Sequence, residues 1–317
     1  MEKDSVIISI IVPVYNSDIY LPECLDSILS SDGVEETEII IVDDGSTDRS
    51  GIISDDYSCR YSNIKVVHKK NEGVADARNV GLFKATGKYV FFLDADDMVV
   101  PSMFSRIIRQ CRDVDVDVIM WDGELIDEAG HCKDGRERDY FSHKGIDDCI
   151  MSGQEYLMRQ LEACKDFPTV VWLGAYKKDY LIDNELFFKN KLHHEDDLWV
   201  PMVLINSKLV KYVSGRLYLY RIHSDSLSHP DRSNINEYIE SLLIIYPFLF
   251  NYIDETISDV KLRKMLKGNL TRKYLHWIFE YDFSEFGYGD KIDKKLLWKN
   301  SNRFRDKLRV IVLFIKG

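Results

Sequence analysis

Three carboxylates follow one apolar run of the chain. Residues Tyr89 to Leu93 have the composition of a buried strand, and Asp94, Asp96 and Asp97 come directly after them. In an open α/β sheet, ligands bind beyond the carboxyl ends of the strands. Clustered carboxylates at that edge would repel one another unless a hard cation such as Mg²⁺ or Mn²⁺ neutralised them. We therefore expect a site for a divalent metal ion and for the phosphates that it would bind.

The same Asp-x-Asp spacing recurs between Asp113 and Asp117. There Asp and Val alternate up to Val118, which is typical of a half-buried strand with one solvated face. This segment is therefore predicted to be a strand rather than a second metal site.

The end of the first strand carries an aromatic and an amide side chain. Pro13 is expected to end that strand's hydrogen-bonded ladder, so that Tyr15 and Asn16 follow at the carboxyl edge of the sheet. The ring of Tyr15 could stack on a base. The alternative is a simple strand-to-helix turn in which Asn16 or Ser17 caps the next helix.

The second strand also ends in acids, and a later helix carries an arginine. Asp43 and Asp44 follow an apolar run and precede a Gly-Ser-Thr turn. A carboxylate at that position could accept the ring N–H of a pyrimidine. Arg78, in a helix directed at the same edge, could reach a base carbonyl or a phosphate. Taken singly these residues suit turns or caps, but their convergence on one edge predicts a nucleotide site.

The first third of the chain alternates short apolar strands with helical segments. This rhythm predicts βαβ units and a parallel sheet covered by helices on both faces. No GxGxxG motif and no Walker A loop occur, so the phosphates must be held in another way. The predicted strands are 6–12, 38–42, 64–68 and 89–93, and the predicted helices are 20–29 and 75–85.

Composition narrows the class of protein. The chain has 317 residues, 45% of them hydrophobic, and a net charge of -11, which argues against nucleic acid as a partner. Its six cysteines show no CxxC or Cys/His zinc spacing, which argues against disulfide and zinc frameworks. The N-terminus lacks the pattern of a signal peptide or a membrane span, so we expect a cytoplasmic protein.

Three regions are expected along the chain. Residues 1–112 would form a nucleotide-binding half, 113–230 a substrate-binding half of the same domain, and 231–317 a helical region; the family resemblance described next implies that the first half binds a nucleotide-sugar and the second the acceptor. The segment 291–317 carries nine Lys and Arg against two acids, interleaved with Leu, Ile, Trp and Phe. Such a basic amphipathic tail either lies on the anionic inner face of a membrane or packs on the body of the protein.

Six sequence blocks resemble the signature blocks of family 2 glycosyltransferases. The resemblance implies a GT-A fold, a Rossmann-like and mostly parallel sheet flanked by helices, with a C-terminal helical extension. It also implies nucleotide-activated sugar donors, commonly UDP-sugars, and Mn²⁺ or Mg²⁺ as cofactor. The blocks are Ser9-Ile-Ile-Val-Pro-Val-Tyr-Asn16, Ile41-Val-Asp-Asp-Gly-Ser-Thr-Asp48, Ala77-Arg-Asn-Val-Gly81, Phe92-Leu-Asp-Ala-Asp-Asp97, His194-Glu-Asp-Asp-Leu-Trp199 and Leu217-Tyr-Leu-Tyr-Arg-Ile-His-Ser-Asp-Ser-Leu-Ser228.

The resemblance also implies roles for individual residues. Asp96 would bind the metal ion, and His223 could complete its ligands or contact the diphosphate. Asp94 would touch the ribose or the metal ion, and either Asp43 or Asp44 the base. The implied nucleotide-sugar contacts together are Pro13, Tyr15, Asn16, Asp43, Asp44, Arg78, Asp94 and Ala95.

A base must take the proton of the acceptor hydroxyl. Asp196 matches the second acidic position of the family's Glu-Asp motif, while Glu195 and Asp197 remain alternatives. Trp172, Tyr176 and Asp197 could contact the acceptor, although core packing is the default role for an aromatic residue. Similar sequences often read Trp-x-Lys-Leu-Tyr where this chain has Trp172-Leu-Gly-Ala-Tyr176, which puts contacts there in doubt.

The sequence therefore predicts an inverting, metal-dependent glycosyltransferase. It would move a hexose or N-acetylhexosamine from a UDP-sugar to a hydroxyl of a glycan or lipid-linked glycan in surface polysaccharide synthesis. Two alternatives stay open: a nucleotidyltransferase that forms sugar nucleotides, and a non-catalytic scaffold that binds UDP-sugars.

Overall fold

One mixed sheet forms the centre of the protein. The computed structural model describes residues 6–133, 141–223 and 234–316. The strand order is β3-β2-β1-β4-β8-β6-β9-β5, with β7 paired to β9. The strands are β1 (Ile8–Val14), β2 (Thr37–Asp43), β3 (Ile64–His68), β4 (Tyr89–Phe92), β5 (Met98–Val99), β6 (Val118–Ile126), β7 (Ile150–Met151), β8 (Gly174–Lys177) and β9 (Val210–Arg221).

The N-terminal part of the sheet is parallel. β3, β2, β1 and β4 pair side by side in the same direction, and β1, β2 and β4 are buried along their whole length. The predicted strands and the expected βαβ arrangement are therefore confirmed. Beyond β4 the direction changes, because β8 runs antiparallel to both β4 and β6, and β9 is parallel to β6.

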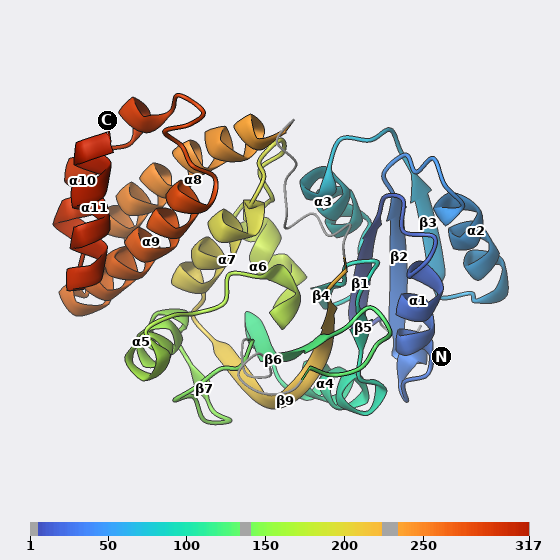
Figure 1. The fold of residues 1–317 in the computed structure, drawn as a ribbon. Helices are drawn as coiled ribbons and strands as arrows, with labels where there is room; N and C mark the ends of the chain where they lie inside the picture. The colour runs from blue at the N-terminus through green and yellow to red at the C-terminus, as the bar shows by residue number, and fades with distance from the viewer. Residues whose placement is uncertain (1–5, 134–140, 224–233, 317) are drawn as a thin grey trace.

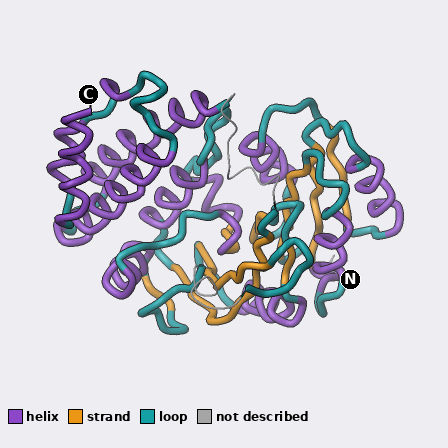
Figure 2. Tube along the Cα trace, viewed as in Figure 1, coloured by secondary structure: helices purple, strands orange, loops and turns teal. Residues whose placement is uncertain are grey.

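Helices cover the sheet and build the C-terminal end (Figures 1 and 2). α8 to α11 lie on the left of Figure 1, at the opposite end of the molecule from β3 and α2. This confirms the predicted helical C-terminal region. The helices are α1 (Leu21–Leu29), α2 (Ser50–Arg60), α3 (Val74–Lys84), α4 (Pro101–Asp113), α5 (Gly153–Cys164), α6 (Lys178–Asp183), α7 (Glu195–Asn206), α8 (Ile235–Thr256), α9 (Val260–Glu280), α10 (Lys294–Asn300) and α11 (Phe304–Lys316).

α3 lies directly on β1. A Cβ atom at Gly81 would stand 2.3 Å from Cγ2 of Ile11, so no larger residue fits without movement. This close approach sets the distance between α3 and the sheet. It therefore also sets the position of Arg78, which lies one helical turn before Gly81 in α3.

Two local predictions were wrong. The Asp-Val alternation is no strand, because α4 ends at Asp113 and β6 begins only at Val118. Its acids serve a loop instead: Asp117 accepts hydrogen bonds from the backbone of Lys208 and Leu209 at 2.7 and 3.0 Å.

The end of β1 also differs from the prediction. β1 continues through Pro13 to Val14, paired with β2. The pairing of β1 with β4 stops at Ile11, so Pro13 follows the end of that ladder without ending the strand.

Candidate active site

The predicted polar residues meet at one edge of the sheet. β2, β1 and β4 are parallel neighbours, so their carboxyl ends lie side by side. Asp43 is the last residue of β2, Tyr15 follows β1, and Asp94 comes soon after β4. The side chain of Tyr15 is half exposed there, as a ring available for stacking would be.

Asn16 ties the loop after β1 to the loop after β2. Its backbone has a left-handed φ of 51°, which Asn tolerates better than most residues. Its backbone N–H donates to Oγ of Ser46 at 3.1 Å, and its Oδ1 accepts from the backbone of Thr47 at 2.8 Å. Asn16 therefore holds the loops after β1 and β2 together rather than capping a helix.

Asp43 and Asp44 are buried and bonded to different partners. Asp43 accepts from the backbone of Ser46 at 3.0 Å and faces Nδ1 of His68 at 2.8 Å. Asp44 accepts from Lys69 at 2.6 Å and from the backbone N–H groups of Glu72 and Gly73 at 3.0 and 2.8 Å. Both carboxylates thus hold the loops of the edge in place, and each still has lone pairs to spare.

The three acids after β4 differ in their surroundings: one is buried and fully bonded, and the other two are partly exposed. Asp97 is buried and accepts from the hydroxyl of Tyr218 at 2.5 Å and from the backbone of Arg221 at 2.7 Å, which links this loop to β9. Asp94 and Asp96 lie less deeply, on either side of the buried Ala95. Burial, and then the charge of Asp94, raise the pKa of Asp96.

His223 stands beside Asp96. Its Nε2 lies 2.8 Å from Oδ2 of Asp96, its Nδ1 is buried without a hydrogen-bond partner among the described residues, and its ring lies 4.8 Å from that of Tyr20. The rest of the matching block, residues 224–228, lies outside the described residues.

These residues fit a divalent cation whose coordination shell would be completed by phosphates of the substrate. Across residues 6–133, 141–223 and 234–316, no three His, Cys, Asp or Glu side chains converge to hold an ion by themselves. However, carboxylates suit Mg²⁺ and Mn²⁺, and Mg²⁺ is commonly held by one or two carboxylates together with phosphates. Burial and the nearby charge of Asp94 both disfavour the anionic form of Asp96, and a bound cation would relieve that cost.

Arg78 connects the sheet edge to α7. Arg78 is 5% exposed, and its guanidinium donates to Asp94 at 2.8 Å and to Glu195 at 2.5 Å. Burial would lower its pKa, but Asp94 and Glu195 outweigh that effect and raise it. Sequence reasoning placed Arg78 at this edge but missed its bridge to Glu195, which is 117 positions away in the chain.

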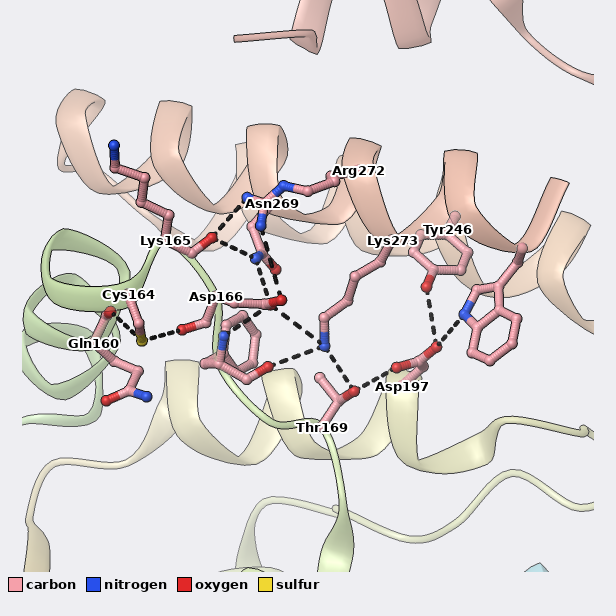
Figure 3. A network of polar contacts seen from close by, with 12 residues as sticks. Gln160, Cys164, Lys165, Asp166, Thr169, Asp197, Tyr246, Asn269, Arg272 and Lys273 are labelled. Carbon is pink, nitrogen blue, oxygen red and sulfur yellow. Dashed lines mark hydrogen bonds and ion pairs between the residues drawn. The ribbon is translucent and has the colours of Figure 1, made fainter. Parts of the chain in front are cut away.

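The three acids at the start of α7 have three different environments. Glu195 is paired with Arg78. Asp197 is buried and accepts from Thr169 at 2.5 Å, Tyr246 at 3.0 Å and Trp277 at 3.3 Å (Figure 3).

Asp196 is the least engaged of the three acids. Its carboxylate accepts from the backbone N–H of Asp197 at 2.9 Å, and no side chain of the described residues bonds to it. Burial, followed by the charges of Glu195 and Asp197, raises the pKa of Asp196 well above its usual range, while Arg78 acts in the opposite direction.

Trp172 and Tyr176 lie in the core. Trp172 is 3% exposed and stacks on Tyr218 at 4.0 Å, and Tyr176 is 1% exposed with its hydroxyl donating to the carbonyl of Val171 at 2.8 Å. Their positions favour packing, and acceptor contact stays an untested prediction for both residues and for Asp197.

Two further features lie close to the predicted residues. Arg221 is buried and bonds to the carbonyls of Asp96 and Glu128 and to the carboxylate of Glu23, so it holds the acidic loop in place. An apolar pocket of about 190 Å³ lies beside Glu195 between α7 and α8, and its walls include Trp199, Met202 and Phe248. Both features join segments that are far apart in the sequence.

The chain belongs to glycosyltransferase family 2. The family profile "Glycosyl transferase family 2" matches residues 9–135. "Glycosyltransferase GlyG" of Streptococcus pneumoniae serotype 4 is 34% identical over 230 residues, which are 70% of this chain and 73% of that protein. "Minor teichoic acid biosynthesis protein GgaB" of Bacillus subtilis is 31% identical over 80% of this chain, although the match spans only 27% of that larger protein.

Solved structures confirm the predicted GT-A fold. TarS 1–349 of S. aureus in complex with UDP superposes with a TM-score of 0.70 at 20% identity, over 98% of this chain and 87% of that one. The same protein with UDP-GlcNAc gives a TM-score of 0.68 at 20% identity, over 98% and 88% of the two chains. Among the described residues no helix is long and apolar enough to cross a membrane.

Proposed function

We propose that this glycosyltransferase moves a hexose or N-acetylhexosamine from a UDP-sugar to a hydroxyl of a glycan or lipid-linked glycan, with inversion. Family membership supports the transfer itself. The similarity to TarS, which was solved with UDP and UDP-GlcNAc, supports a UDP-sugar donor. The relationship to a teichoic acid biosynthesis protein supports a surface polysaccharide as the product.

The observation that carries the proposal is that the three acids at the start of α7 have different hydrogen-bond partners. Glu195 is engaged by Arg78 and Asp197 by three donors, which leaves Asp196 as the proposed general base. A raised pKa suits this role, because a base works best when its pKa lies near the operating pH.

The proposed reaction is a single displacement. The acceptor oxygen attacks the anomeric carbon on the face opposite to UDP, and Asp196 takes the hydroxyl proton as the new C–O bond forms. The bond from the anomeric carbon to the β-phosphate oxygen breaks, and its electron pair leaves with UDP. Arg78, held by Asp94 and Glu195, keeps the sheet edge and α7 in register while this happens.

The nucleotide would bind along the carboxyl edge. We propose that Tyr15 stacks on the uracil and that Pro13, Asn16, Asp43, Asp44 and Arg78 surround it, with Asp94 and Ala95 near the ribose and phosphates. The half-exposed ring of Tyr15 and the braced loop around Asn16 support this placement.

Mn²⁺ or Mg²⁺ is the proposed cofactor. Asp96 and His223 would hold it, with Asp94 beside them. When bound, such an ion supplies positive charge for the diphosphate leaving group.

We also propose that the enzyme works in the cytoplasm, at the inner face of the membrane. A lipid-linked acceptor is confined to that surface, so peripheral association would bring enzyme and acceptor together.

The test is UDP release from a panel of UDP-sugars, with and without Mn²⁺, in wild type, Asp96→Ala and Asp196→Asn. Metal-dependent release from one donor, lost in both variants, is expected. Pyrophosphate release from a nucleoside triphosphate and a sugar phosphate would instead indicate a nucleotidyltransferase. UDP-sugar binding without turnover, even with glycan acceptors present, would indicate a scaffold.

A further inference from the structure

α11 presents an apolar stripe to solvent. Phe304, Leu308, Ile311, Val312 and Ile315 recur at the spacing of one helix face, which normally packs on a core. Here their exposed fractions run from 39% to 78%. Phe314 of α11 and Trp298 of α10 are exposed beside them. An open hollow at this place is lined by Trp298, Ile311, Phe314 and Lys295.

The opposite face of α11 already holds the helix in place. Asp306, Val310 and Leu313 are at most 4% exposed, and the helix packs on α9 and α10 through this side. The exposed stripe is therefore not needed to attach α11 to the body. Exposed apolar patches of this kind mark a contact with a partner or a membrane.

Basic side chains surround the stripe. Segment 291–317 has a net charge of +7, whereas the remainder of the chain has a net charge of -18. The exposed basic residues here are Lys291, Lys295, Lys299, Arg303, Arg305 and Lys307. Lys307 lies over the ring of Trp298 at 5.3 Å, so cationic and apolar groups share one surface.

We propose that this surface, the outer face of α10 and α11, docks on an anionic lipid membrane. A helix with an apolar stripe and flanking Lys and Arg lies in the plane of the interface, with the stripe among the acyl chains and the cations at the headgroups. α11 has 13 residues, too few to span a bilayer. A symmetric contact with a second copy is disfavoured, because it would bring two basic surfaces together.

The difference in charge between segment 291–317 and the remainder of the chain would also orient the protein on the membrane. The anionic headgroups attract the basic end and repel the acidic remainder of the chain, so docking through any other face is disfavoured. This inference goes beyond the proposed reaction and holds whether or not the donor is a UDP-sugar.

Vesicle co-sedimentation of the whole chain tests the proposal. Wild type is compared on phosphatidylcholine vesicles and on vesicles that also contain phosphatidylglycerol, at low and high salt. The apolar variant is Phe304→Ser with Ile315→Ser, and the charge variant is Lys295→Glu with Lys299→Glu. Matched controls are Ile52→Ser with Phe83→Ser, and Lys84→Glu with Lys208→Glu, which alter residues that are exposed elsewhere.

Wild type is expected to bind the anionic vesicles about tenfold or more tightly than the neutral ones, and less tightly at high salt. Both α10–α11 variants should lose about tenfold or more of that binding, while the two controls keep it. Phe304 and Ile315 are the most exposed members of the stripe, so the thermal midpoint should not change.

Other outcomes would overturn the proposal. Absent vesicle binding by wild type, or equal binding by all variants, would show that this face is not a membrane surface. A change from dimer to monomer in the apolar variant, without vesicle binding by wild type, would assign the face to self-association. Vesicle-free UDP release is measured in parallel, so that failure of the reaction and failure of docking are told apart.

Discussion

Three neighbouring carboxylates on α7 are chemically alike but have different surroundings. Glu195 offsets the charge of Arg78, Asp197 accepts from one loop residue and two residues of other helices, and Asp196 bonds to a backbone N–H. All three lie at the positive end of the helix dipole, which favours acids. The partners of each residue, rather than its type, therefore determine which acid is left for proton transfer.

Asp196→Asn should abolish most of the transfer. The amide keeps the size of the side chain but does not accept the acceptor's proton, so kcat should fall by about 10²–10⁴. UDP binding should change little, because the nucleotide edge is intact. Titration calorimetry with UDP and a steady-state assay check both points, and Asp179→Asn on the exposed surface of α6 serves as the matched control. Equal activity of the two variants would exclude Asp196 as the base.

The raised pKa of Asp196 predicts the pH dependence of the reaction. Below that pKa the carboxyl is protonated and does not act as a base, so kcat/KM should fall as the pH is lowered through it. Because the charge of Arg78 lowers this pKa, Arg78→Met should move the acidic limb to higher pH. The pH profiles of wild type and variant check the sign. A shift to lower pH would contradict the assignment.

At the scale of elements, the contact of α3 with β1 sets the geometry of the nucleotide edge. Gly81→Ala would place a methyl group 2.3 Å from Cγ2 of Ile11, so helix and strand must move apart. Overpacking of this kind costs about 1–3 kcal/mol of unfolding free energy. Denaturant titration should show that loss, together with weaker UDP binding, because Arg78 moves with α3.

A double mutant separates this clash from a general effect of alanine. Ile11→Ala alone should destabilise through the cavity it leaves in the core, where Ile11 is fully buried. Combined with Gly81→Ala, it should cost less than the sum of the two single changes, since the new methyl group occupies part of that cavity. Strict additivity would contradict the close contact.

The elements that sequence reasoning found are those with a local signal. The parallel strands are continuous apolar runs, and the acids that follow them stand out by contrast, so β1 to β4 and their carboxyl edge were predictable. The Asp-Val alternation wrongly predicted a strand, because Asp117 bonds to the backbone of residues 208 and 209, about ninety positions away, and no local pattern shows this contact. The identities of the hydrogen-bond partners of Arg221 and Asp197 were equally hidden, since these partners lie on distant helices and loops.

At the scale of the whole molecule, Asp197 joins the catalytic half to the C-terminal helices. Thr169 comes from the loop before β8, Tyr246 from α8 and Trp277 from α9, and all three donate to the one carboxylate (Figure 3). Lys273 of α9 extends the network by donating to Thr169 at 2.9 Å. The residue next to the proposed base is thereby tied to α8 and α9, so we expect these helices to influence the position of Asp196.

Two stacked tyrosines allow this link to be tested. Tyr246 and Tyr274 stack with their ring centroids 4.5 Å apart, but only Tyr246 donates to Asp197. Within the described residues the hydroxyl of Tyr274 makes no hydrogen bond. Tyr246→Phe keeps the stack and removes a hydrogen bond to a charged acceptor, so it should cost roughly 1.5–3 kcal/mol of unfolding free energy. Tyr274→Phe should leave stability nearly unchanged. Denaturant unfolding of both variants, followed by kcat at a temperature where both are folded, gives the comparison. If Asp197 positions the base, only Tyr246→Phe lowers kcat; equal losses in both variants would mean that the stack, rather than the carboxylate, holds α7 to the C-terminal helices.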